Sequence, residues 1–270
     1  MRSNRFQEAV AGRGAAFGHM IMEFGTRGIP RILEAAGVDF AVIDMEHSGF
    51  DCDRIADLLA CFRAVDVAPF VRVPQPLYHF IARVLDAGAL GVMIPNVETS
   101  EQALEVVRAA KYSPEGNRGV GLGTAHTDYL MPDPALYLAE ANRRTTVICQ
   151  IESPLGVANS ASIAGVPGVD CLWVGHFDLS HAMGIPGQFR DARFLDALNA
   201  VARAALGHGK LAGAQPGTLD QAREWWAGGF RVLSWRSDIA LYRQALTEGV
   251  GALSAVLGEG SASSCSSKSQ

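Results

Sequence analysis

The chain has 270 residues, of which 49% are hydrophobic and 19% are charged, and its formal net charge at pH 7 is −5. This apolar content is enough for one large core, whereas the lack of a basic excess argues against a surface that follows nucleic acid. No apolar run approaches the roughly 18 residues that cross a bilayer, and none follows the two early arginines, so we predict neither a membrane span nor a signal peptide.

One unit recurs along the chain: a stretch of helical periodicity, a glycine, a few residues and then an apolar run. The glycine suits the left-handed conformation that ends a helix, and each run is typical of a parallel strand buried on both faces. Eight such runs occur, at 15–22, 39–45, 68–73, 90–95, 146–151, 170–175, 210–215 and 230–235.

Segments of helical periodicity, such as Asp51–Val65, separate the runs, and Thr99 with Gln102 and Thr218 with Gln221 have the spacing of capping boxes. Alternation of this kind predicts an α/β fold with a parallel sheet, and eight units favour a closed (β/α)8 TIM barrel. A doubly wound open sheet is the alternative.

We predict a single barrel domain over residues 1–257 and a disordered polar tail over 258–270. The loop 113–133 lies in the long gap after the fourth strand, so we expect it on the face where barrels keep their chemistry. Its His126 and Tyr129 are candidates for contact with a substrate.

Two carboxylates, Glu152 and Asp178, directly follow neighbouring predicted strands. Carboxylates that converge there would repel each other unless a proton or a cation intervened, and hard oxygen ligands suit Mg²⁺ or Mn²⁺. The alternative is that one or both cap the following helix.

A second polar group follows the second and third strands. Asp44 and His47 suit a carboxylate that orients a catalytic imidazole, although a histidine at a strand end is more often an ordinary loop residue. Glu46, between them, contacts a metal-bound water or faces solvent. Arg72 interrupts an apolar strand, where it meets either a substrate enolate or, structurally, a salt bridge to Asp44 or Glu46.

Other reactive groups are scarce. None of the three lysines (Lys111, Lys210, Lys268) follows a strand, which disfavours a Schiff-base aldolase. The glycine-rich GNRGVGLG does not join a strand to a helix, so we expect no nucleotide. Five cysteines lack motif spacing and indicate reduced thiols in a cytoplasmic protein, namely Cys52, Cys61, Cys149, Cys171 and Cys265. Of these, Cys149 and Cys171 lie in apolar runs and should be buried.

From about residue 15 to 255, the sequence resembles the HpcH/HpaI family of metal-dependent (class II) pyruvate aldolases. The resemblance rests on six pieces in the family's order and spacing: IDMEH, VRVP, DAGALGVMIPNVET, KYSPEGNRGVG, QIES and VGHFDLS. It implies a divalent metal (Mg²⁺, Mn²⁺ or Co²⁺) and a homohexamer in which the final helix, here about 238–256, packs on a neighbouring subunit. That helix has an apolar face of Ile239, Leu241, Leu246 and Val250, which packing within one subunit explains equally well.

The resemblance also implies roles for individual residues. Glu152 and Asp178 become metal ligands, and His47, held by Asp44, becomes the base that acts on the substrate hydroxyl. Arg72 then contacts the keto oxygen and the enolate that develops from it. In the same pattern, Gln150 helps to hold the keto acid.

Three positions depart from the family pattern. His176 and Phe177 stand where the family has proline and a small residue; Phe177 keeps a backbone N–H for the substrate but changes the pocket wall. His176 is either a further ligand or, more in keeping with its turn, a partner of the backbone. Arg236 at the end of strand eight either receives an acidic tail of the aldehyde partner or pairs with Asp238.

The resulting hypothesis is an aldolase that cleaves or forms 4-hydroxy-2-oxo acids, yielding pyruvate and an aldehyde. The alternatives are decarboxylation of a 2-oxo acid such as oxaloacetate, enolate chemistry like that of macrophomate synthase, and a barrel that binds a keto acid without turnover. The sequence does not specify the aldehyde, the stereochemistry or the preferred metal.

Overall fold

The structure, a computed structural model, describes residues 3–257. Eight parallel strands form a closed barrel in sequence order, and β1 completes it by pairing with β8. The strands are β1 (Ala16–Ile21), β2 (Phe40–Asp44), β3 (Ala68–Arg72), β4 (Gly91–Ile94), β5 (Thr146–Ile151), β6 (Cys171–Val174), β7 (Leu211–Ala214) and β8 (Val232–Ser237). Seven fall within their predicted runs, and β8 ends two residues late, so the barrel is confirmed and the open sheet is excluded.

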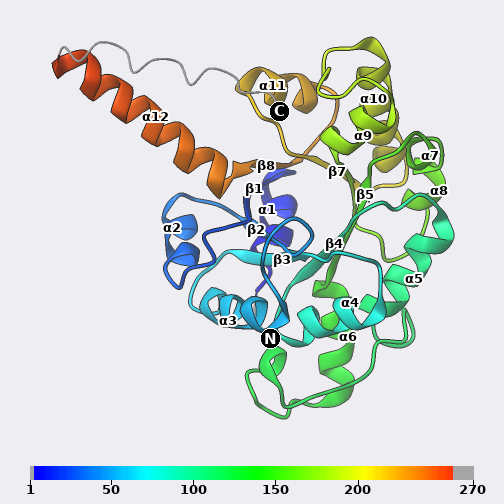
Figure 1. The fold of residues 1–270 in the computed structure, drawn as a ribbon. Coiled ribbons are helices and arrows are strands. Elements are labelled where there is room, and N and C mark those ends of the chain that lie inside the picture. Colours follow the sequence, from blue (N-terminus) through cyan, green and yellow to red (C-terminus); the bar gives the residue numbers. More distant parts are fainter. Residues whose placement is uncertain (1–2, 258–270) are drawn as a thin grey trace.

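Helices surround the barrel (Figure 1). Two of the predicted caps are present: Thr99 and Gln102 form a complete capping box, and the Thr218 side chain accepts a hydrogen bond from the Gln221 backbone. After the first helix come α2 (Ile29–Ala35), α3 (Cys52–Phe62), α4 (Tyr78–Asp86), α5 (Ser100–Ala110), the short 3-10 helix η1 (Ala125–Thr127), α6 (Pro134–Arg144), α7 (Pro154–Ala158), α8 (Ser160–Ala164), α9 (His176–Ala182), α10 (Ala192–Gly207), α11 (Leu219–Ala227) and α12 (Asp238–Leu257).

The first helix, α1 (Arg5–Arg13), closes the amino-terminal end of the barrel and was not predicted. Phe6 packs edge-on against Phe40 and Phe70, with ring centroids 5.4 and 5.0 Å apart. Phe6 is only 2% exposed, and burying an aromatic side chain of this kind stabilises a fold by about 1.5–3 kcal/mol. This end of the barrel is therefore sealed by apolar packing.

The last helix, α12, projects away from the barrel (Figure 1). On its predicted apolar face, Ile239, Leu246 and Val250 are 41%, 49% and 58% exposed. Packing within one subunit therefore does not cover this face. Among residues 3–257 no helix combines the length and the apolar character that a membrane crossing needs.

The predicted position of the loop 113–133 is wrong. The loop follows α5 rather than a strand, and α5 carries the chain to the other end of the barrel. Accordingly, Nδ1 of His126 lies 3.2 Å from the carbonyl oxygen of Asp86, the last residue of α4. His126 is thus remote from the carboxyl ends of the strands in its own subunit.

The cysteines that are described, Cys52, Cys61, Cys149 and Cys171, are free thiols, and the last two are buried as predicted. Burial raises the pKa of Cys149 to about 12, so its thiol is inert. The predicted tail, 258–270, and Cys265 within it lie outside the described residues.

Candidate active site

A cavity of about 700 Å³ opens at the carboxyl ends of the strands. Six of the predicted site residues line it, namely His47, Arg72, Gln150, Phe177, Asp178 and Arg236. The other two, Asp44 and Glu152, are buried and hydrogen-bond to lining residues. The barrel therefore brings all eight to one end, because parallel strands finish on the same side.

Arg72 is held from two sides by carboxylates. Its Nε and Nη2 donate to the two carboxylate oxygens of Asp44 at 2.8 and 2.6 Å, and Nη1 lies 3.2 Å from Oε2 of Glu46. Burial alone would lower the pKa of Arg72, but the hydrogen bonds and charge of Asp44 outweigh it and raise that pKa. The salt-bridge alternative is thus confirmed. Two of the five guanidinium N–H donors make hydrogen bonds, both to Asp44, and the contact with Glu46 is an ion pair, so donors remain for a substrate in the cavity.

His47 is placed differently from the prediction. The Asp44 carboxylate binds Arg72 and the backbone N–H of Glu46, so it does not orient His47. Instead, Nε2 of His47 lies 3.7 Å from Oε2 of Glu46, and its side chain is 54% exposed. Asp44 and Arg72 are directly registered across β2 and β3, which explains why the arginine takes the carboxylate.

Glu152 is almost fully buried and shares its surroundings with Asp178. Its Oε2 accepts from the backbone N–H of Asn96 at 2.9 Å, and its Oε1 accepts from Nε2 of Gln150 at 2.6 Å. Burial first, and then the negative charges of Asp178 and Glu46, raise the pKa of Glu152 to about 7. A carboxylate in this position is stabilised by a cation.

The Glu152 side chain packs directly against the backbone that follows β6. A Cβ at Gly175 would lie 2.2 Å from Oε1 of Glu152 and 2.8 Å from Nε2 of Gln150, so only glycine is compatible with this arrangement. Within residues 3–257 no group of three or more His, Cys, Asp and Glu residues has a metal-binding arrangement. Two carboxylates with the remaining positions left to water and substrate suit Mg²⁺. The residues present fit a divalent cation of that kind.

The two residues that depart from the family pattern after β6 have different roles. The His176 ring is buried against Phe189 and Trp225, with centroids 5.0 and 5.7 Å apart, and burial lowers its pKa to about 4. It makes no three-ligand group with the carboxylates, so its interpretation as a further ligand is not supported. Phe177 is 64% exposed and forms part of the cavity wall.

Arg236 lines the cavity but does not pair with Asp238, so that alternative is wrong. Its Nη1 donates to Oε1 of Gln244 and its Nη2 to the carbonyl oxygen of Gly217, both at 2.7 Å. Asp238 instead accepts from the backbone N–H groups of Met22, Glu23 and Phe24. Arg236 has a φ of 53°, a strained conformation that persists only where neighbours hold it.

Sequence reasoning missed Gln215, which directly follows β7 and lines the cavity. The rule that found the other residues, a polar side chain at the end of a strand, applies to it equally. Its amide provides a further polar group on the side of the cavity that also holds Arg236.

A closed parallel barrel whose cavity holds a guanidinium, an imidazole and the carboxylate of Asp178, with the buried carboxylate of Glu152 beside it, has the features of an enzyme site. Comparisons with known proteins agree. The sequence model of the HpcH/HpaI aldolase/citrate lyase family matches residues 27–245. A hydroxypyruvate/pyruvate aldolase of Delftia acidovorans is 36% identical over 230 residues, which are 84% of each chain.

A 5-keto-4-deoxy-D-glucarate aldolase of Shigella boydii is 35% identical over 214 residues, covering 79% of this chain and 82% of its own. The crystal structure of an HpcH/HpaI aldolase from Desulfitobacterium hafniense matches with a TM-score of 0.87 and 32% identity, covering 92% of this chain and 96% of that one. The protein belongs to the HpcH/HpaI aldolase/citrate lyase family, and it is an aldolase, a carbon–carbon lyase.

Proposed function

We propose that this aldolase is metal-dependent and cleaves 4-hydroxy-2-oxo acids to pyruvate and an aldehyde, or forms them in reverse. The observation that carries the proposal is the pair of carboxylates beside Arg72: Asp178 is exposed and lines the large cavity, and Glu152 is buried close enough for the charge of Asp178 to raise its pKa. Glu152 and Asp178 would hold Mg²⁺, Mn²⁺ or Co²⁺. When bound, this cation supplies an electrophile that withdraws charge from the 2-oxo group.

Arg72 stabilises the charge that develops on the keto oxygen. Asp44 and Glu46 fix the guanidinium in place, and its remaining N–H donors serve the substrate. Because the donors are already oriented before the reaction, they favour the enolate over the ground state. The amide of Gln150 uses one N–H for Glu152, and its second N–H contacts the bound keto acid.

His47 acts as the base. It removes the proton from the 4-hydroxyl of the substrate, the C3–C4 bond breaks, and the aldehyde leaves. The electron pair of the broken bond remains on the pyruvate part as the enolate, which is protonated at C3 to give pyruvate. Glu46, the carboxylate near Nε2 of His47, stabilises the imidazolium that forms.

Arg236 and Phe177 lie where the aldehyde half would sit, because both line the same cavity as Arg72 and Asp178. The Nε of Arg236 is buried and has no hydrogen-bond partner among residues 3–257. This donor suits an acidic tail on the aldehyde. Phe177, in contrast, provides an apolar wall, which suits an apolar part of the aldehyde.

We also propose that the protein is a cytoplasmic homo-oligomer, a hexamer as the family resemblance implies, in which α12 packs on a neighbouring subunit. The exposed apolar face of α12 and the free thiols support this assignment. Light scattering would give the mass of the assembly. Replacement of Leu246 and Val250 by Asp should reduce that mass, and an unchanged mass would contradict the assignment.

The test of the proposed reaction is metal removal. The protein is treated with EDTA, and pyruvate formation from 4-hydroxy-2-oxo acids is followed with and without added Mg²⁺, Mn²⁺ or Co²⁺. We expect chelation to abolish pyruvate formation and the metals to restore it. Unchanged turnover after exhaustive chelation would overturn the proposal, and pyruvate from oxaloacetate alone would favour a decarboxylase.

A further inference from the structure

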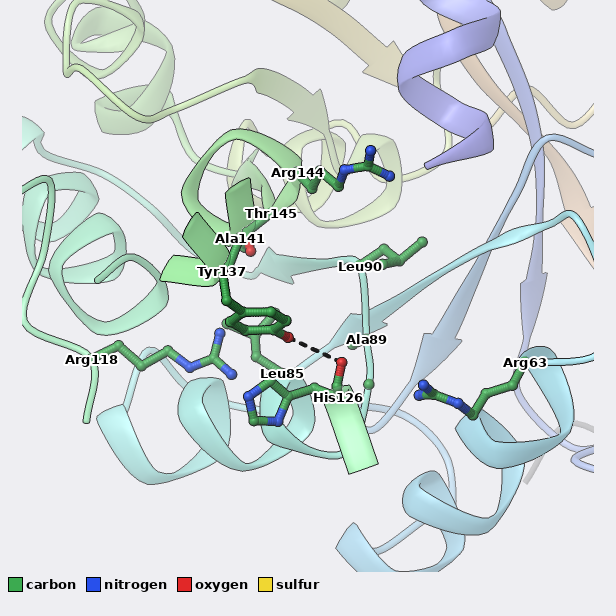
Figure 2. Close-up of a pocket in the computed structure, with 11 residues that line it drawn as sticks. Arg63, Leu85, Ala89, Leu90, Arg118, His126, Tyr137, Ala141, Arg144 and Thr145 are labelled. Carbon is green, nitrogen blue, oxygen red and sulfur yellow. Dashed lines mark hydrogen bonds between the residues drawn. The ribbon is translucent and has the colours of Figure 1, made fainter. Parts of the chain in front are cut away.

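A second cavity, of about 40 Å³, lies at the other end of the barrel (Figure 2). Its walls include Leu90, directly before β4, and Thr145, directly before β5. Parallel strands all begin at one end of a barrel, so this cavity lies at the amino-terminal end, away from the catalytic residues. His126 from the loop 113–133 and Tyr137 from α6 complete it.

The lining is cationic. Arg63, Arg118 and Arg144 line the cavity, whereas the carboxylates that pair with them, Asp128, Asp86 and Glu140, are not among the lining residues. Arg118 is the most buried of the three, at 5% exposure, and its guanidinium lies over the Tyr112 ring, 4.7 Å from the centroid. Its buried Nε has no hydrogen-bond partner within residues 3–257. A charged donor left in this state is unfavourable unless a ligand accepts from it.

His126 places an acceptor in the same cavity. Its Nδ1 lies 2.9 Å from Oγ1 of Thr124 and 3.2 Å from the Asp86 carbonyl oxygen. The Thr124 hydroxyl donates its hydrogen to the Gly121 carbonyl oxygen, so both neighbours of Nδ1 accept and Nδ1 carries the hydrogen. Burial and the nearby charge of Arg118 lower the pKa of His126, so the ring is neutral and Nε2 presents a lone pair. This atom too is buried without a partner in the described part of the chain.

Figure 2 shows Arg118 and His126 beside the ring of Tyr137, whose centroid is 5.6 Å from that of His126. The hydroxyl of Tyr137 donates to the backbone carbonyl oxygen of His126 at 3.0 Å and so fixes this segment against α6. The cavity thus combines a cationic donor, a neutral acceptor and a rigid wall.

We propose that this cavity binds a small oxyanion that still carries a hydroxyl, such as hydrogen phosphate. The charged oxygens accept from Arg118, and the hydroxyl donates to Nε2 of His126. A buried water molecule needs a cavity of about 10–15 Å³. A cavity of about 40 Å³ therefore has room for a free tetrahedral anion but not for a phosphorylated metabolite. Such an ion joins two parts of the loop 113–133, at Arg118 and His126, independently of the aldolase reaction.

The test is calorimetric titration of the full chain, treated with EDTA, with inorganic phosphate at constant ionic strength. We expect one saturable site per chain. Sulfate, which carries no hydroxyl at neutral pH, should bind about tenfold more weakly, as expected for the loss of one hydrogen bond. Absence of saturable phosphate binding, or equal affinity for the two anions, would overturn the proposal.

Variants locate the site. His126→Phe keeps an aromatic ring but removes the acceptor, and Arg118→Lys keeps the charge but removes Nε; each should weaken phosphate binding about tenfold or more. Arg72→Lys is the matched control in the catalytic cavity and should leave phosphate binding unchanged. Loss of binding in Arg72→Lys but not in His126→Phe would assign the anion to the catalytic cavity instead. Near-ultraviolet circular dichroism checks that each variant folds. If Arg118→Lys does not fold, phosphate binding by His126→Phe alone tests the proposal.

Discussion

At the amino-terminal end of the barrel, the strands enclose the rings of Phe6, Phe40 and Phe70, all at most 2% exposed. At the carboxyl-terminal end they enclose Arg72 and Glu152, which are nearly as buried, at 6% and 4% exposed. The degree of burial is therefore similar at the two ends, but the buried side chains are aromatic at one end and charged at the other. Apolar burial stabilises the fold, whereas burial of charged groups is costly and persists where the groups have a function.

This contrast separates stability from catalysis along the barrel axis. A substitution in the aromatic seal should change the free energy of unfolding and leave turnover intact. A substitution among the buried charges should do the reverse, provided that no uncompensated charge is left behind.

The largest expected effect comes from Glu152→Gln. Turnover should fall on the order of 10³-fold, because one of the two carboxylates proposed to hold the divalent cation is lost. The free energy of unfolding should not decrease, since the amide is neutral while burial already raises the pKa of the native acid to about 7. Steady-state kinetics and urea unfolding measure the two quantities. Turnover within about tenfold of the wild type would remove Glu152 from the site.

Phe6→Ala tests the other end. Loss of a buried aromatic side chain costs about 3–5 kcal/mol in the free energy of unfolding, while kcat should stay within about twofold of the wild-type value. Phe17→Ala is the matched control, because Phe17 is 44% exposed and its loss should cost less. If Phe6→Ala lowered kcat without lowering stability, the proposed division of the barrel would be wrong.

His47→Gln should lower kcat on the order of 10²-fold through the loss of a general base. Stability should not change, because the side chain is 54% exposed. His79→Gln, at an exposed position on α4, provides the control and should retain full activity. Equal activities of the two variants would show that another group removes the substrate proton.

The strands and most of the cavity were predictable because apolar runs locate the strands and the position along a strand decides the end of the barrel. Which side chains hydrogen-bond to one another was not predictable. Asp44 and His47 are close in sequence, but Asp44 binds Arg72 because the two are paired across neighbouring strands. That register depends on the closed barrel and is not contained in local spacing.

Two further errors have physical reasons. The helix α1 buries only Phe6 and Ala9, too few apolar positions for a periodic signal, yet Phe6 reaches the barrel core. The loop 113–133 was assigned to the catalytic end because the long gap that contains it follows the fourth strand. The intervening α5 reverses the chain direction and carries the loop to the amino-terminal end, where His126 lies.

The smallest expected effect is that of Arg236→Met, which sharpens the comparison within the catalytic cavity itself. Arg236 makes no hydrogen bond to the groups assigned to the enolate; its side chain donates to Gln244 and Gly217. Its loss should therefore raise KM for an aldehyde with an acidic tail about tenfold, while kcat with an uncharged aldehyde stays unchanged. Aldol addition of pyruvate to the two classes of aldehyde, followed by product formation, measures the difference. An equal loss of activity with both classes of aldehyde would mean that Arg236 supports the cavity wall at β8 and does not bind the acidic tail of the aldehyde. Of the two residues assigned to the aldehyde, only Phe177 would then select it.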